Sequence, residues 1–116
     1  MTRLPDSLLK GPLMPDDSTA FFVAEVGKKI IGLARTKFDK SRALLDSLVV
    51  HRDYRNSGIG FGLSQTQVNH ALDKGYRHLK VLVENKPSAI KSYGDLGFKV
   101  GAEVPEFGIV EMELIK

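Results

Sequence analysis

Cysteine is absent from the sequence. A chain without thiols forms no disulfides, carries no thiolate nucleophile and offers no sulfur ligand to a metal. Its three histidines, His51, His70 and His78, are not spaced as metal ligands, so we expect no metal site. Long apolar runs are also missing, and none approaches the ~20 residues that cross a membrane as a helix. We therefore expect neither a thiol enzyme nor a membrane protein.

The remaining composition is that of an ordinary globular chain. Hydrophobic residues make up 42% of the 116 positions and charged residues 27%, which suits one modest core. Residues 1–6 lack the apolar segment of a signal peptide, so we expect a cytoplasmic protein. The net charge of +3 fits a phosphorylated cofactor, a nucleic acid, or simply a solvated surface.

Turn residues divide the chain into short segments of regular structure. Residues 1–19 hold three prolines and a polar cluster, which predicts an irregular lead-in with one helical turn at residues 7–10. Residues 20–116 are predicted to form a single domain. Its strands are expected at residues 20–26, 29–36, 42–50, 78–83, 98–102 and 107–115, and its helices at residues 59–74 and 87–96.

The middle of the chain determines the expected sheet. Residues 42–83 read as strand, helix and strand, and such a unit pairs its strands in parallel through a right-handed crossover. Strict alternation along the first of these strands puts Leu44, Asp46 and Leu48 on one face and Leu45, Ser47 and Val49 on the other.

A polar loop with two glycines, Arg55 to Gly60, joins that strand to the helix. Backbone N–H groups at a helix start have no partner within the helix, and the helix dipole adds partial positive charge there. Gly58 and Gly60 let the backbone approach an anion, and Arg55 adds a fixed positive charge. The loop is therefore a candidate pyrophosphate cradle, the alternative being a plain strand-to-helix turn. It lacks the Lys-Ser or Lys-Thr pair of a nucleotide P-loop and the third glycine of a dinucleotide fingerprint.

Two stretches of the sequence match one family. Val50 to Gly60 resembles the acetyl-CoA-binding motif of the GNAT superfamily of N-acetyltransferases: a strand-ending valine, four residues, Arg or Gln, two residues, Gly, any residue, Gly. Asn85, Ala89-Ile90, Tyr93 and Leu96-Gly97-Phe98 resemble the family's second signature. The resemblance covers roughly residues 21–116. It implies an α/β (α+β) fold with a mixed, mostly antiparallel twisted sheet, a central parallel β-α-β unit and helices on both faces.

The resemblance also implies acetyl-CoA as the co-substrate. Its pantetheine arm would lie where the strand parts from its parallel neighbour, hydrogen-bonded to the backbone of Leu48, Val49 and Val50. The residues implied to hold the pyrophosphate are Arg55, Asn56, Ser57, Gly58, Ile59, Gly60 and Phe61. Asn85 matches the family asparagine near the pantetheine. It stands four rather than three residues before the Ala-Ile pair, and its alternative role is a helix cap ahead of Pro87.

The reaction implied is acetyl transfer to a primary amine, small molecule or protein, by direct attack in a ternary complex. Tyr93 matches the family tyrosine whose hydroxyl faces the cofactor sulfur and can donate a proton to the departing thiolate. The amine must lose a proton before it attacks, and Asp46 is the first candidate base, with Glu84 second and His51 third. The alternatives are a core aromatic for Tyr93 and plain surface charges for the acids.

The sequence departs from the family at its N-terminus. Most relatives begin with a strand and two helices, whereas only 19 residues precede the first strand expected here. Either the acceptor site is open, or a second subunit completes it, or the chain binds CoA without catalysis. We expect a homodimer, because a strand at residues 20–26 that lacks its usual neighbour presents a free edge with Phe21 and Phe22.

Two rival functions come from other classes of protein. A catalytically silent CoA-binding sensor or regulatory module, bound to a protein partner, would agree with the short N-terminus. A nucleic-acid-binding domain would need basic residues interleaved with aromatics on one face. The expected helix at residues 59–74 is nearly uncharged until its end, so we expect no nucleic acid partner.

Overall fold

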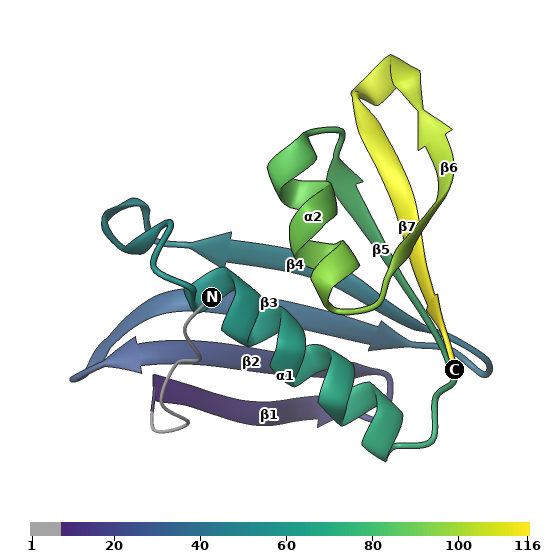
Figure 1. Ribbon diagram of the computed structural model, residues 1–116. Coiled ribbons are helices and arrows are strands. Elements are labelled where there is room, and N and C mark those ends of the chain that lie inside the picture. The colour runs from purple at the N-terminus through teal and green to yellow at the C-terminus, as the bar shows by residue number, and fades with distance from the viewer. Residues whose placement is uncertain (1–7) are drawn as a thin grey trace.

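The computed structural model describes residues 8–116, which form one seven-stranded sheet with two helices packed on it (Figure 1). The strands are β1 (Leu9–Asp16), β2 (Thr19–Val26), β3 (Lys29–Phe38), β4 (Ala43–Val50), β5 (His78–Glu84), β6 (Lys99–Val104) and β7 (Ile109–Ile115). The helices are α1 (Ile59–Asp73) and α2 (Pro87–Asp95), with 3-10 turns η2 (Arg52–Tyr54) and η3 (Pro105–Phe107). The order is β1-β2-β3-β4-β5-β7-β6, and β4 with β5 is the parallel pair. This confirms the predicted α/β class and the central parallel unit.

The helices arise from ordinary helix signals. Pro87 opens α2 at a position where its missing N–H costs no hydrogen bond, and Gly75 follows the end of α1 with a φ of +98°. The apolar side of α1 is buried against the sheet through Ile59, Leu63 and Val68. Neither helix of the described residues is both long and apolar enough to cross a membrane.

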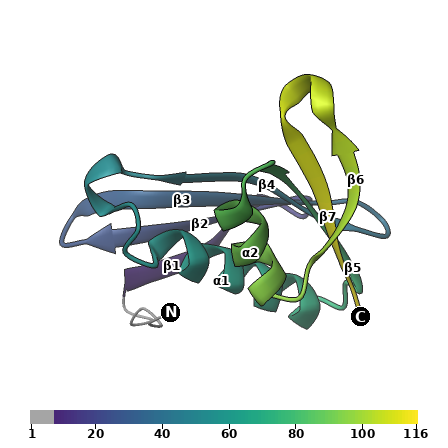
Figure 2. The same cartoon turned by 45° about the horizontal axis from the view of Figure 1, so that its top comes forward.

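Both helices lie on the same face of the sheet, which corrects the expectation of helices on both faces (Figures 1 and 2). The connectivity explains this. β6 runs parallel to β5, because both are antiparallel to β7. The connections β4-α1-β5 and β5-α2-β6 therefore step in the same direction across the sheet, and two right-handed crossovers in one direction put their helices on one side.

The lead-in is a strand rather than an irregular segment. β1 pairs antiparallel with β2, from Leu9 opposite Ala24 to Asp16 opposite Thr19, with two register shifts. The prediction of an irregular segment was wrong because it rested partly on Pro12 and Pro15. An edge strand has a neighbour on one side only, so it can contain prolines, which have no N–H to donate. Of the helical turn expected at residues 7–10, residue 7 lies outside the described residues, and residues 9 and 10 are in β1. The edge of β2 is covered, so the argument offered for a homodimer does not hold.

A β-bulge interrupts β4 at Asp46. Arg35 of β3 pairs with Ser47 and Thr36 pairs with Leu45, which leaves Asp46 as an extra residue. Such a residue shifts the alternation of the strand by one position. Leu45 and Leu48 consequently both face the helices, while Val49 is 60% exposed on the other side, so the alternation predicted for this strand was wrong.

Candidate active site

β4 and β5 separate at this bulge. Their pairing covers three positions, from Ala43 opposite Leu79 to Leu45 opposite Val81. From Asp46 onward β4 has no pairing with β5, so backbone groups on that side of β4 are left for another partner. The cleft between the strands has a volume of about 460 Å³. The expected parting of the two parallel strands is therefore present.

Residues from both faces of the sheet line the cleft. On the helix side its walls include Gln67 of α1, and Ala89 and Tyr93 of α2. On the opposite side lie Val49 of β4 and Leu82 of β5, which are 60% and 55% exposed. A ligand lying between the two strands could thus meet a second molecule that arrives from the helix-free side.

The loop before α1 has the geometry of an anion site. Asn56 and Gly58 both adopt positive φ, 61° and 90°, and Gly58 is the N-cap of α1. Within the described residues, no backbone N–H from Asn56 to Phe61 donates to a backbone carbonyl. These amides lie at the positive end of a 15-residue helix, beside an open depression of about 680 Å³.

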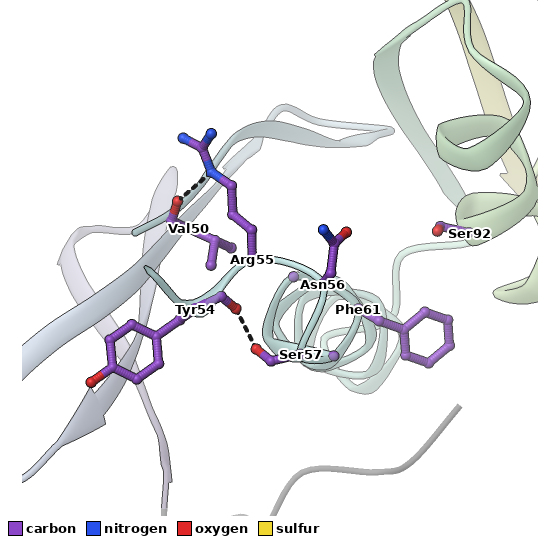
Figure 3. A pocket seen from close by; sticks show the side chains of 9 residues that line it. Val50, Tyr54, Arg55, Asn56, Ser57, Phe61 and Ser92 are labelled. Atoms are coloured by element: carbon purple, nitrogen blue, oxygen red, sulfur yellow. Dashed lines mark hydrogen bonds between the residues drawn. The ribbon is translucent and has the colours of Figure 1, made fainter. Parts of the chain in front are cut away.

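Two side chains of the loop turn back toward the residues before it (Figure 3). The hydroxyl of Ser57 donates to the carbonyl of Tyr54, which ties the loop to its own start. Arg55 turns back toward β4, where its Nε donates to the carbonyl of Val50 at 3.1 Å. Phe61 and Ser92 stand on the far side of the depression, Ser92 on α2. Arg55 therefore fixes the end of β4 and keeps its guanidinium at the rim.

The depression and the cleft both adjoin a third pocket, and we call this row of three pockets the channel. A smaller pocket of about 220 Å³ lies between α1 and α2 and links them. It shares Gly60, Phe61 and Ser92 with the depression at the loop, and Leu48, Ala89 and Tyr93 with the cleft. A long ligand with a phosphate at one end can therefore run from the loop, between the helices and the end of β4, to Tyr93.

Tyr93 is held at the inner end of this channel. Its side chain is 9% exposed and packs edge-on against Phe98, with the ring centroids 5.6 Å apart. Its hydroxyl lies 3.1 Å from that of Ser64 on α1. Burial raises the pKa of Tyr93 above its ordinary value, and the hydrogen bond with Ser64 opposes this in part. The phenol therefore keeps its proton at neutral pH and is available as a donor.

Asp46 lines the same cleft as Tyr93 and faces the helix-free side. Its carboxylate forms an ion pair with Arg35 of β3, and Lys37 Nζ lies 4.0 Å from it. These contacts fix the orientation of the carboxylate. Asp46 is also the bulged residue of β4, so it has no partner residue on β3. Asp46 and Tyr93 thus approach the cleft from opposite faces.

The other predicted residues are more scattered. Glu84 lines the cleft, but its carboxylate pairs with Lys86 at 3.0 Å and is well exposed. Asn85 has an exposed side chain and donates its backbone N–H to Gly108 at 2.8 Å; Lys86, not Asn85, is the N-cap of α2, so the capping alternative was wrong. His51 is not a wall of the cleft: its Nδ1 accepts from the N–H of Asp53 and caps η2.

Two residues of α1 that the sequence analysis did not select also belong to the site. Ser64 holds the hydroxyl of Tyr93, and Gln67 lines the cleft although it is buried. Both fall on the sheet-facing side of α1, and a polar residue there is an available signal, because buried polar groups need partners. Their partners are far along the chain and cannot be identified from spacing.

Comparison with known proteins identifies the family. The profile of the family described as acetyltransferase (GNAT) domain matches residues 4–114. The probable N-acetyltransferase camello of Xenopus laevis is 34% identical over 95 residues, which is 78% of this chain and 43% of that protein. Its counterpart in Xenopus tropicalis is 32% identical over 90 residues, 74% of this chain and 41% of that protein. The chain thus spans less than half the length of these curated relatives.

Solved structures show the same fold. The PaiA N-acetyltransferase of Thermoplasma acidophilum in complex with coenzyme A superposes with a TM-score of 0.74 at 22% identity, covering 85% of this chain and 62% of that one. The ribosomal-protein-S18-alanine N-acetyltransferase of Escherichia coli gives 0.75 at 22% identity, covering 86% and 70%. A GNAT family acetyltransferase of Elizabethkingia anophelis with acetyl-CoA bound gives 0.73 at 18% identity, covering 85% and 77%. With a family profile that accounts for nearly its whole length, the chain belongs to the GNAT acetyltransferases.

Proposed function

We propose that this chain transfers an acetyl group from acetyl-CoA to a primary amine by direct attack within a ternary complex. The observation that carries the proposal is the channel of adjoining pockets from the glycine loop to Tyr93. It begins at free helix-start amides, ends at a buried phenol and opens toward the helix-free side of the sheet. Solved relatives with coenzyme A or acetyl-CoA bound support this use of the channel.

The residues present suit coenzyme A. The positive φ of Gly58 exposes the amides that follow it, and the pyrophosphate would rest on the N–H groups from Asn56 to Phe61. The pantetheine arm carries amides, and the unpaired edge of β4 from Leu48 to Val50 offers matching backbone groups. Acetyl-CoA, when bound, supplies an acetyl thioester that an amine can attack.

Tyr93 is proposed as the general acid. Its buried phenol holds a proton at Oη, and the hydrogen bond with Ser64 fixes the position of the phenol oxygen. A proton delivered to the leaving sulfur avoids releasing a bare thiolate into an apolar channel. The packing of Tyr93 on Phe98 keeps water away from that side of the ring.

Asp46 is proposed as the general base, with Glu84 as the alternative. An amine acceptor arrives protonated, and a carboxylate at the mouth of the cleft can accept that proton directly or through water. Arg35 keeps the carboxylate of Asp46 in place on the helix-free side. The acceptor would enter on the same side, past Val49 and Leu82, where no helix of the described residues covers the sheet.

A CoA-binding module without catalysis is the second candidate. The engagement of Asp46 with Arg35 and Lys37 is the observation that favours it, because a carboxylate already paired with two cations is less available to contact an incoming amine. The two functions differ in turnover and share the cofactor site.

An acceptor screen tests the proposal. The protein is incubated with acetyl-CoA and a panel of amines, including small aliphatic and aromatic amines and peptides with free N-termini. Thiol release and the acetylated amine are measured together, by a thiol reagent and by mass spectrometry. We expect equal amounts of both products with at least one acceptor class. Binding of acetyl-CoA with no acetylated product from any class would favour the CoA-binding module.

A further inference from the structure

Gln67 is a buried polar residue at the point where β4 and β5 part. It lies in the middle of α1, its side chain is 1% exposed, and it forms part of the helix-side wall of the cleft. A glutamine placed so deeply needs partners for its amide group, since an unpaired buried donor is costly.

The partners of Gln67 are on β3, opposite the bulge of β4. Its Nε2 donates to the carbonyl of Arg35 at 2.9 Å and to Oγ1 of Thr36 at 3.1 Å. Arg35 and Thr36 pair with Ser47 and Leu45 of β4, and the extra residue, Asp46, lies between those two partners. The amide of Gln67 thus donates hydrogen bonds from the helix side to the two β3 residues at which the regular β3–β4 pairing is interrupted.

The same bulge is held from the other face. The guanidinium of Arg35 forms an ion pair with the carboxylate of Asp46 on the helix-free side. Arg35 is therefore fixed by its carbonyl on one side of the sheet and by its side chain on the other. Pairing of β4 with β5 ends at Leu45, directly before the bulged residue, so the held bulge and the opening of the cleft occupy the same place along β4.

We propose that Gln67 is a positioning residue that holds the bulge of β4 and thereby the cleft that takes the pantetheine arm. This rests on the proposed use of the cleft for CoA. Under this proposal Gln67 affects binding of the pantetheine arm only, because the phosphate loop lies at the far end of the channel and does not include Gln67. Loss of its hydrogen bonds should weaken binding of the arm and leave binding of the nucleotide end unchanged.

The test compares two ligands on matched variants. Gln67→Met keeps the length of the side chain and removes its donors, while Val68→Ala truncates a buried neighbour on the same helix without touching the cleft walls. Dissociation constants are measured by calorimetry for acetyl-CoA and for adenosine 3′-phosphate 5′-diphosphate, the nucleotide end without the arm. We expect Gln67→Met to weaken acetyl-CoA on the order of tenfold and the nucleotide less than about twofold. Val68→Ala should lower the melting temperature and leave both constants near those of the parent.

A second, milder variant keeps the test valid if Gln67→Met does not fold. Thr36→Val removes one of the two acceptors of Gln67 and should weaken acetyl-CoA about two- to threefold. Parental affinity for acetyl-CoA in both Gln67→Met and Thr36→Val, or an equal loss for both ligands, would overturn the inference. A parent that binds neither ligand would overturn the proposed function and this inference together. A parent that binds acetyl-CoA but transfers nothing would overturn only the transfer.

Discussion

The hydroxyl of Tyr93 lies 3.1 Å from the hydroxyl of Ser64, so a residue of α1 orients the phenol of α2. The two residues are 29 positions apart and meet only because both helices pack on one face of the sheet. The fold thus brings the proposed acid to the inner end of the channel and fixes the position of its hydroxyl oxygen.

Tyr93→Phe tests the role of that proton. The change removes the hydroxyl and keeps the ring on Phe98, so acetyl-CoA affinity should stay nearly intact. Turnover should fall by about ten- to a thousandfold, the range expected for the loss of one positioned proton donor. Steady-state kinetics with thioesters of differing thiol acidity provide the check, and the defect should shrink as the leaving thiol becomes more acidic. Transfer at the parental rate would make Tyr93 a core aromatic only.

Ser64→Ala is the companion change. It leaves the phenol in place and removes the partner that orients it. We expect a smaller loss of turnover than for Tyr93→Phe, about three- to tenfold, and no further loss when the two changes are combined. Additive losses in the double variant would show that Ser64 acts independently of Tyr93.

Asp46→Asn tests the proposed base. Asparagine keeps the shape of the side chain and can still accept a hydrogen bond from Arg35, so the bulge should survive. Turnover should fall most at neutral pH and recover as pH rises, because more of the amine is then already neutral. The pH–rate profile is measured beside that of Glu84→Gln. A pH-dependent defect in Glu84→Gln alone would move the role of base to Glu84.

His70 should make stability depend on pH. Its ring packs against Phe22 and Phe38, with centroid distances of 5.3 Å and 5.7 Å. Burial, followed by the charge of Lys74 and partly opposed by Asp73, lowers the pKa of His70 below its ordinary value of 6.5. The unfolded chain then binds a proton more readily than the folded one, so stability is lost as pH falls below about 6.5 toward the folded-state pKa.

The measurement is the melting temperature at pH 7.5 and at pH 5, for the parent and for His70→Phe. Phenylalanine preserves an aromatic ring in the cluster and cannot be protonated. The parent should lose more on acidification than the variant, by a difference on the order of a few degrees. His51 and His78 are present in both proteins, so their effects cancel in the comparison. Equal losses in the two proteins would contradict the assignment to His70.

The positions of most elements were predictable from local patterns. β2, β3, β5, α1 and α2 lie within a few residues of the predicted ranges, because apolar runs and the residues Pro87, Gly75 and Gly97 mark them directly. β1 was missed, since its prolines look irregular until the sheet supplies a neighbour on one side only.

Features that depend on pairing were not predictable in this way. The bulge at Asp46 exists only as a mismatch between two strands, and no property of β4 alone indicates it. It puts Leu48 on the same face as Leu45 and Val49 on the opposite face, contrary to the predicted alternation. The shared face of the two helices follows from the position of β7 between β5 and β6, which connectivity along the chain does not reveal.

The glycine loop offers a matched pair of substitutions. Gly58 and Gly75 both have positive φ, 90° and 98°, so a side chain strains the backbone similarly at either position. Gly58→Glu also puts a side chain and a negative charge into the proposed pyrophosphate cradle. Gly75→Glu places the same group at the other end of α1, where nothing lies within 4 Å of the added Cβ.

Calorimetric titration of acetyl-CoA into the parent, Gly58→Glu and Gly75→Glu tests the central claim most directly. The account predicts saturable one-to-one binding by the parent and by Gly75→Glu, and no detectable binding by Gly58→Glu at cofactor concentrations of about a millimolar. Absence of binding by the parent at that concentration, or parental affinity in Gly58→Glu, would contradict it.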